Sequence, residues 1–419
     1  MILFRLTWQS LLNRKSTILL TVLSLSVSIM LVMAVDTLRT QTKSSFSSTV
    51  SGTDLIVGAK GGSINLLLYS VFRLGDATNN LSWSSYQAIS RHSKVAWSIP
   101  FSLGDSHRGY PVLGTSSDYF KYFRYGKKQP LALEQGKEFE GVFDVVIGSD
   151  VAEKLQYKLG DSVVIAHGRG NASLVEHDDK PFKVVGILEP TGTPVDQTLH
   201  VSLAAIEAIH IDWKAGVQIP GSGGAYTEEQ LSELQPKQIT AFMLGLTSRF
   251  STFHLQRSIN QYSKEPLQAI IPGLALQSLW QIFSLAEQAL LVVSGLVIIS
   301  SMLGLMTLLL ASLNERRREI AILRSVGARL WQILSLLILE SFLVTAISII
   351  LGMLLLYLNL LLLAPWLQTE FGVWLSITGP TLWQWQLIAV LLVSGTVVGA
   401  VPGYRAYKQS LADGVAVKI

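Results

Sequence analysis

Four long stretches of this 419-residue chain are almost free of charged side chains, and they constrain its fold more than any other feature. These stretches are Ser16–Val35, Gln288–Asn314, Leu330–Thr369, which contains one charge at Glu340, and Phe371–Tyr404. A membrane-spanning helix needs about 20 predominantly apolar residues. The sequence therefore predicts four transmembrane helices, at about 17–36, 288–312, 332–363 and 384–402. The first apolar run is longer than that of a signal peptide and no small-x-small cleavage site follows it, which favours an uncleaved anchor.

The densest charge in the chain lies between the second and third spans, at 313–329. Charged side chains are unfavourable in the hydrocarbon core of a bilayer, so the stretch must lie at a membrane face. Helix-forming residues fill Glu315–Gly327, Ile320 and Leu323 precede Gly327 at helical spacing, and glycine is a common helix terminator. We interpret the stretch as a short helix presented to a soluble partner. The simpler alternative is a turn whose arginines only fix the membrane topology.

Basic residues next to the spans indicate the orientation of the chain. They flank the first span, recur within 314–329 and follow the fourth span, whereas the loop 364–382 contains no lysine or arginine. By the positive-inside rule, both termini and the charged stretch face the cytoplasm. The formal net charge of +4 therefore reflects membrane topology and does not indicate nucleic-acid binding.

The residues between the first and second spans read as a soluble, mixed α/β domain. β-Branched segments bounded by Gly, Pro or Asp predict strands. The predicted strands are 54–57, 145–147, 162–167, 182–187, 199–202, 239–246 and 267–271. Short helices are expected at 150–157 and 249–262, and a helix from Leu274 should continue into the second span. We therefore predict a 1+3 α-helical membrane protein with a large α/β domain between its first two spans.

This reading predicts nine segments along the chain. They are an amphipathic segment at 1–15, span 16–36, an outer domain with a stalk at 37–281, span 282–313, the charged helix 314–329, span 330–363, a short outer loop 364–382, span 383–403 and a tail at 404–419.

Motifs for catalysis are missing from the sequence. There is no cysteine, no GxSxG, no HExxH and no Walker A motif, so we expect no enzyme and no nucleotide site in this chain. The acidic patch Glu176–Asp179 could bind a divalent metal, with His167, His200 or His210 nearby in the fold. Consecutive residues on a turn do not converge easily on one ion, so we interpret the patch as a solvated loop and predict no metal site.

The predicted spans contain an interior carboxylate and a glycine motif. Glu340 is the interior carboxylate of the third span, and a structural ion pair is expected for it because no chain of ionisable groups accompanies it. Gly395, Gly399 and Gly403 form two overlapping GxxxG spacings, which permit close helix packing in the fourth span.

The segment from Glu315 to Ala328, ERRREIAILRSVGA, closely resembles the cytoplasmic signature of the FtsX-like/MacB-like permeases, the type VII ABC transporters. Val401–Ala406 resembles their element after the last span, and 146–161 with 184–190 resemble their periplasmic core. The resemblance covers most of the chain, but no ATPase domain is fused to it. It implies a bacterial inner-membrane permease that acts as a dimer, with its large domain in the periplasm.

The resemblance also implies partners and residue roles. A separate cytoplasmic ABC ATPase would bind ATP and Mg²⁺, and this chain would hold no cofactor. A second permease copy, completing a homodimer, and a periplasmic adaptor or binding protein are further partners that the resemblance suggests. The residues expected to couple to the ATPase are Glu315, Arg316, Glu319, Ile320, Leu323, Arg324 and Gly327, while Arg317 and Arg318 would meet lipid phosphates. The substrate stays open, and so do two alternatives: an ATP-driven regulator of a periplasmic hydrolase or sensor, and a metal-handling system.

Overall fold

The computed structural model describes residues 5, 7, 9, 11, 12, 14–49, 51–168, 180–211, 213–214, 217–218, 227–371 and 377–415. Two compact units make up the chain. One comprises 1–41, 284–369 and 375–419 and is called the helical unit below; the other comprises 42–283 and 370–374 and is called the sheet domain. The predicted fold class, four long apolar helices with a mixed α/β domain between the first two, is confirmed.

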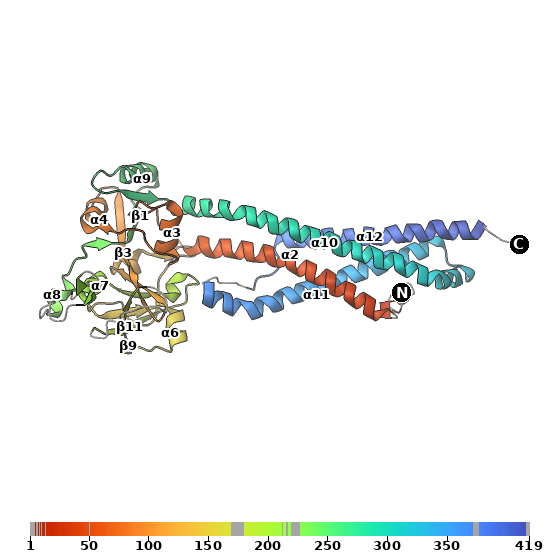
Figure 1. The fold of residues 1–419 in the computed structure, drawn as a ribbon, viewed down its shortest axis with the longest axis horizontal. Coiled ribbons are helices and arrows are strands. Elements are labelled where there is room, and N and C mark those ends of the chain that lie inside the picture. The colour runs from red at the N-terminus through yellow and green to blue at the C-terminus, as the bar shows by residue number, and fades with distance from the viewer. Residues whose placement is uncertain are drawn as a thin grey trace. The chain divides into compact units, whose positions relative to one another are not determined.

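Four long helices carry the apolar runs (Figure 1). They are α2 (Lys15–Thr49), α10 (Pro272–Ser325), α11 (Leu330–Phe371) and α12 (Leu382–Val415). Their candidate spans are Lys15–Ser44, Pro272–Ala311, Trp331–Ala364 and Leu382–Pro402. The helices extend beyond the apolar runs, because a helix ends at a cap or a turn and not where hydrophobicity stops. The amphipathic segment predicted for 1–15 falls largely outside the described residues.

Small side chains hold the helical unit together. A Cβ atom on Gly395 would lie 2.9 Å from the Cβ of Thr345, and one on Gly399 would lie 2.5 Å from the Cβ of Ser341, so α12 packs closely on α11 at both positions. Gly352 brings α11 close to α2 in the same way, since a Cβ there would meet a backbone oxygen of α2 at 2.9 Å. Small residues permit this approach between helices in a membrane, where apolar burial alone gives little attraction.

Polar bridges add to this packing within the helical unit. The hydroxyls of Ser28 on α2 and Ser301 on α10 are 2.7 Å apart. The Nε2 of Gln384 on α12 donates to the Oδ2 of Asp36 on α2 at 3.1 Å. These contacts link α2 to α10 and to α12, so every long helix of the unit has a specific neighbour.

The sheet domain is built on one large mixed sheet. Its order is β17-β1-β16-β3-β4-β12-β8-β11-β7, with β10 paired to β3 and β9 paired to β11. Pairs β12–β4 and β11–β8 are parallel, and the other neighbours are antiparallel. The strands are β1 (Leu55–Ala59), β3 (Val95–His107), β4 (Tyr110–Thr115), β7 (Leu133–Gly136), β8 (Asp144–Ile147), β9 (Ser162–Val163), β10 (Ala166–His167), β11 (Phe182–Leu188), β12 (Leu199–Ser202), β16 (Ala241–Leu246) and β17 (Leu267–Ile270).

Short elements complete the domain. The helices are α3 (Ser63–Val71), α4 (Trp83–Ser90), α5 (Asp118–Tyr122), α6 (Ser149–Leu155), α7 (Leu203–His210), α8 (Glu228–Ser232) and α9 (Thr252–Asn260), with 3₁₀ turns η1 (Pro194–Gln197) and η2 (Arg249–Ser251). Three small pairs join β2 (Leu81–Ser82) to β15 (Gln238–Ile239), β5 (Arg124–Tyr125) to β6 (Gln129–Pro130), and β13 (Trp213–Lys214) to β14 (Val217–Gln218).

Most predicted strands match the structure, but several findings differ. The predicted strand 239–246 is divided into β15, which pairs with β2, and β16, which pairs with β1 and β3. β4 and β7 lie where no strand is expected. The strand expected at 162–167 is divided: β9 pairs with β11 and β10 pairs with β3, so the chain changes partner between them. The longest strand, β3, lies where no strand is expected, because Pro100 and Gly104 interrupt its pattern. Its first half pairs with β16 and contains Pro100 opposite Phe242, and its second half pairs with β4 and contains Gly104 in a register shift.

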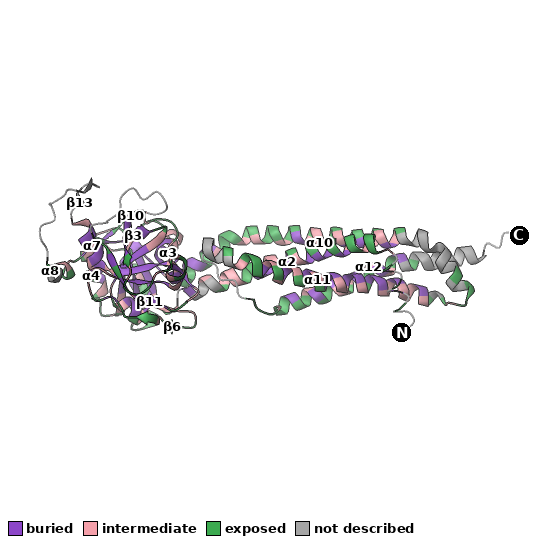
Figure 2. Ribbon diagram, turned by 90° about the horizontal axis from the view of Figure 1, so that it is seen from below, coloured by how far each residue is buried: buried purple, intermediate pink, exposed green. Residues whose placement is uncertain are grey.

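Large aromatic side chains fill the interior of the sheet domain, where buried residues dominate the strands (Figure 2). Phe101, Phe182 and Phe242 are almost fully inaccessible to solvent. Leu276 and Leu279, from the first turns of α10, are buried in the same core cluster as Phe101. α10 therefore begins as part of the core of the sheet domain.

Candidate functional site

The end of α10 presents apolar side chains to the surroundings. Ile322 is 56% exposed and Val326, just past the last helical residue, is 84% exposed. They are four residues apart, and the Val326 N–H donates to the Ile322 carbonyl, so they lie next to each other at the helix end. Trp331, at the start of α11, is also more than half exposed. Exposed apolar groups beside a charged helix end are typical of a protein-binding surface.

A tight connection joins α10 to α11. Gly327 has a φ of +96°, a left-handed conformation that glycine adopts without a steric penalty and that commonly ends helices. A Cβ there would meet nothing within 4 Å, so the glycine is required by the backbone conformation and not by crowding. The Arg329 N–H then donates to the Oε1 of Gln332 at 2.8 Å, which caps the beginning of α11. The position of this turn is thus fixed by the backbone and its caps.

The predicted coupling residues lie on one continuous element. Glu315, Arg316, Glu319, Ile320, Leu323 and Arg324 all belong to α10. The short helix predicted for this segment is the last part of α10, which is continuous from Pro272 to Ser325. The helix ends where Gly327 was expected to end it.

Ile322 and Val326 were not among the predicted coupling residues. In an α-helix, positions 315, 319, 322 and 326 share one face, because they follow the spacing i, i+4, i+7, i+11. This spacing was present in the sequence and would have added both residues to the site.

The membrane-interior residues of the predicted set lie in the helical unit. Glu340 is buried on α11 with 3% of its surface exposed, beside the buried Ser341. The Ser341 hydroxyl donates to the carbonyl of Gly395, so the close approach of α12 to α11 includes a hydrogen bond. Gly403 continues the same helix. The acidic patch Glu176–Asp179 lies outside the described residues.

Comparisons with known proteins identify the class. Residues 18–229 match the model of the MacB-like periplasmic core domain, and residues 291–411 match that of the FtsX-like permease C-terminal domain. The chain therefore belongs to the MacB/FtsX-like permease family. As a member of this family it is a multi-pass transmembrane subunit of an ABC transporter.

Solved structures show only a low similarity to this chain. The periplasmic region of MacB from Actinobacillus actinomycetemcomitans is similar with 12% identity and a TM-score of 0.35, covering 55% of this chain and 94% of that one. The extracellular domain of the noncanonic ABC-type transporter YknZ from Gram-positive bacteria has 12% identity and a TM-score of 0.31, covering 52% and 99%. No curated protein matches the chain.

Proposed function

We propose that this chain is the permease subunit of a type VII ABC transporter whose separate cytoplasmic ATPase docks at the end of α10. ATP and Mg²⁺ bind to that partner, and its hydrolysis cycle moves the sheet domain through the helices, which is called mechanotransmission. The movement serves extrusion or release of an envelope substrate. The observation that carries the proposal is the exposed pair Ile322 and Val326 at the end of an arginine-rich helical segment.

The continuity of α10 supports the transmission of force. Leu276 and Leu279 are buried in the core of the sheet domain, while Ile322 lies near the other end of the same unbroken helix. A continuous helix transmits displacement along its axis better than a flexible linker would. The basic residues beside the spans support an inner-membrane orientation with both termini and the end of α10 in the cytoplasm and the sheet domain in the periplasm.

A groove in the helical unit supports a second permease copy as a partner. It has a volume of about 550 Å³ and is lined by Leu20, Leu308 and a larger number of hydroxyl and small residues of α2 and α10, among them Thr17, Thr21, Ser24, Ser301 and Gly304. Side chains of this kind are enriched where membrane helices associate. A helix of a second copy is the occupant that we propose for it.

Measurement of stimulated ATPase activity tests the docking site. The permease and its ATPase are reconstituted in liposomes, and the ATPase rate is compared with that of the ATPase alone. Charge reversal at Arg316 and Glu319 together, or Val326→Asp alone, should reduce the stimulation about tenfold or more, because a buried contact of about 1.4 kcal/mol or more is lost. The matched control is Arg317→Gln, which removes a charge from the same segment and should retain the stimulation. Unchanged stimulation in the first two variants, with normal membrane insertion, would contradict the proposal.

A further inference from the structure

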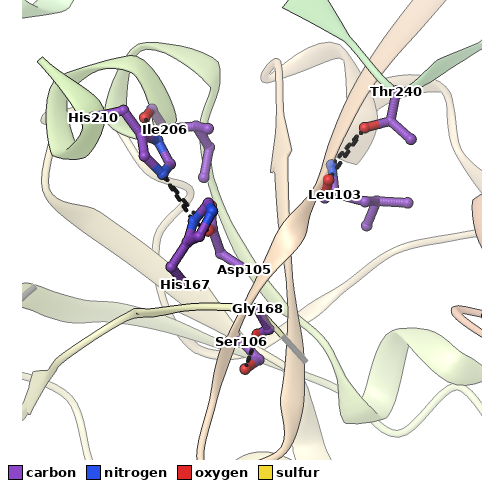
Figure 3. A network of polar contacts seen from close by, with 8 residues as sticks. All are labelled: Leu103, Asp105, Ser106, His167, Gly168, Ile206, His210 and Thr240. Atoms are coloured by element: carbon purple, nitrogen blue, oxygen red, sulfur yellow. Dashed lines mark hydrogen bonds and ion pairs between the residues drawn. The ribbon is translucent and has the colours of Figure 1, made fainter. Parts of the chain in front are cut away.

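Two histidines and a buried aspartate converge in the sheet domain near the end of β3 (Figure 3). The Nδ1 of His167 lies 3.0 Å from the Oδ1 of Asp105. The Nε2 of His210 lies 3.2 Å from the same Nδ1 and 3.8 Å from the same Oδ1. Three atoms able to ligate a metal therefore lie together, although their residues come from three separate elements of the domain.

The fold places each of these side chains specifically. β10 pairs with β3 so that His167 is directly opposite Asp105, which brings the two side chains onto the same side of the sheet. The register between β3 and β4 shifts between Leu103 and Ser106, and Gly104 has a φ of +150°, so Asp105 lies in a bulge. Bulges commonly redirect a side chain toward a functional site. His210 is the last residue of α7.

A backbone contact fixes the tautomer of His210. Its Nδ1 lies 2.6 Å from the carbonyl oxygen of Ile206, which can only accept, so this nitrogen carries the proton and donates it. The Nε2 of His210 is then left with a lone pair, and Figure 3 shows it pointing toward His167 and Asp105. Metal-binding histidines almost always donate their other N–H to a carbonyl or carboxylate in this manner.

The spacing of the three atoms matches a tetrahedral ion. With metal–ligand bonds of about 2.0–2.1 Å, neighbouring ligands of tetrahedral zinc lie about 3.3 Å apart. The three observed separations, 3.0, 3.2 and 3.8 Å, lie on both sides of this value. Two imidazole nitrogens and one carboxylate favour zinc and its neighbours among the transition metals over Mg²⁺ or Ca²⁺, which prefer oxygen ligands.

We propose that Asp105, His167 and His210 form a binding site for a divalent transition-metal ion, with zinc as the reference ion. The ligands are Oδ1, Nδ1 and Nε2, and the fourth tetrahedral position takes an exchangeable ligand. Asp105 is buried, whereas the side chain of His167 is 57% exposed, so the ion reaches the site from solvent. An exposed three-ligand site suits reversible binding better than a permanent structural role. The inference revises the prediction of no metal site and is independent of the ATPase docking proposal.

Zinc binding to the full-length chain tests the site. The protein is purified in detergent with a tag that contains no histidine. Zinc alone is then titrated into a mixture of the protein and a chromophoric chelator, which compete for the ion. One zinc ion per chain is expected. His167→Gln and His210→Gln should lower the affinity by at least about 10–100-fold, the loss that even an outer-shell change typically causes. The matched control, His254→Gln, changes an exposed histidine of α9 and should bind as the wild type does.

Thermal unfolding and a cobalt(II) spectrum distinguish the loss of a metal ligand from misfolding of the variant. Because the His167 side chain is mostly exposed, His167→Gln should leave the unfolding temperature nearly unchanged. Cobalt(II) bound to the wild type should show the strong visible bands of a tetrahedral site, and His167→Gln should abolish them. The proposal is overturned if the wild type binds no zinc, or if the variants and the control bind it equally well.

Discussion

Phe101, Phe182 and Phe242 fill the interior of the sheet domain, whereas Gly395 and Ser341 lie at close helix contacts of the helical unit. The apolar side chains of the long helices often point outward instead, as the exposed positions along α10 and α12 show (Figure 2). The sheet domain thus buries its largest hydrophobic side chains, whereas the long helices expose many of theirs.

The surroundings of each region explain the difference. In water, burial of apolar surface is the main force that stabilises a domain. In a bilayer, lipid tails are as apolar as leucine, so helices associate through close packing and hydrogen bonds. The contrast predicts that the same kind of substitution has different effects in the two regions.

The largest expected effect is the loss of an aromatic ring from the sheet domain. Phe101→Ala should lower the free energy of unfolding of this domain by about 3–5 kcal/mol, because it leaves a cavity in the core. Leu296→Ala on α10, where the side chain is exposed, should change stability by less than about 0.5 kcal/mol. Hydrogen exchange of the sheet amides and thermal unfolding in detergent measure the two effects. Similar losses of stability in both variants would contradict the difference between the sheet domain and the helical unit.

The opposite substitution should damage the helical unit. Gly395→Leu forces a side chain into the contact with Thr345 and should destabilise the helical unit by about 3 kcal/mol. Gly295→Leu on α10 is the matched control, because a Cβ there meets nothing within 4 Å. Thermal unfolding in detergent reports the difference, and an unfolding temperature for Gly395→Leu equal to that of the control would show that close helix packing is not required.

A smaller effect concerns pH and the sheet domain alone. His200 is fully buried, and burial, reinforced by the charge of Arg73, lowers its pKa from 6.5 to about 3. The folded domain therefore keeps this histidine neutral, while the unfolded chain takes up a proton below pH 6.5. Stability is complete above pH 6.5 and falls as the pH decreases toward 3, by about 2 kcal/mol at pH 5.

His200→Gln should remove this part of the pH dependence, while His92→Gln, a change of an exposed histidine, should retain it. Hydrogen exchange of the sheet amides at pH 7 and pH 5, corrected for the intrinsic exchange rates, gives the two slopes. A slope in His200→Gln equal to that of the wild type would exclude the histidine as its source.

Much of the fold was predictable because charge and hydropathy act locally. The four spans follow from uncharged runs, and strands such as β8 and β12 follow from short β-branched segments. β3 was not predictable in this way, because Pro100 and Gly104 interrupt its local pattern and the strand depends on a change of partner from β16 to β4. That exchange depends on pairings between residues far apart in the sequence.

The candidate sites show the same limit. The charged end of α10 was predictable from its composition and its family signature, but its exposed apolar residues required the helix phase. Asp105 was overlooked beside His167 and His210, because its place depends on the pairing of β10 with β3 and on the bulge. Local patterns thus indicate which residues are polar or apolar, while long-range pairing decides which of them meet.

Cross-linking of a single cysteine is the most direct test of the central claim, that the end of α10 contacts a cytoplasmic ATPase. The chain contains no cysteine, so Val326→Cys introduces a unique thiol at the exposed helix end. A short thiol-to-amine cross-linker applied to isolated membranes should join this position to the ATPase subunit. Phe250→Cys, at an exposed position of the sheet domain, should give no such product. A Val326→Cys protein that forms no adduct with the ATPase, while the complex remains intact, would contradict the account.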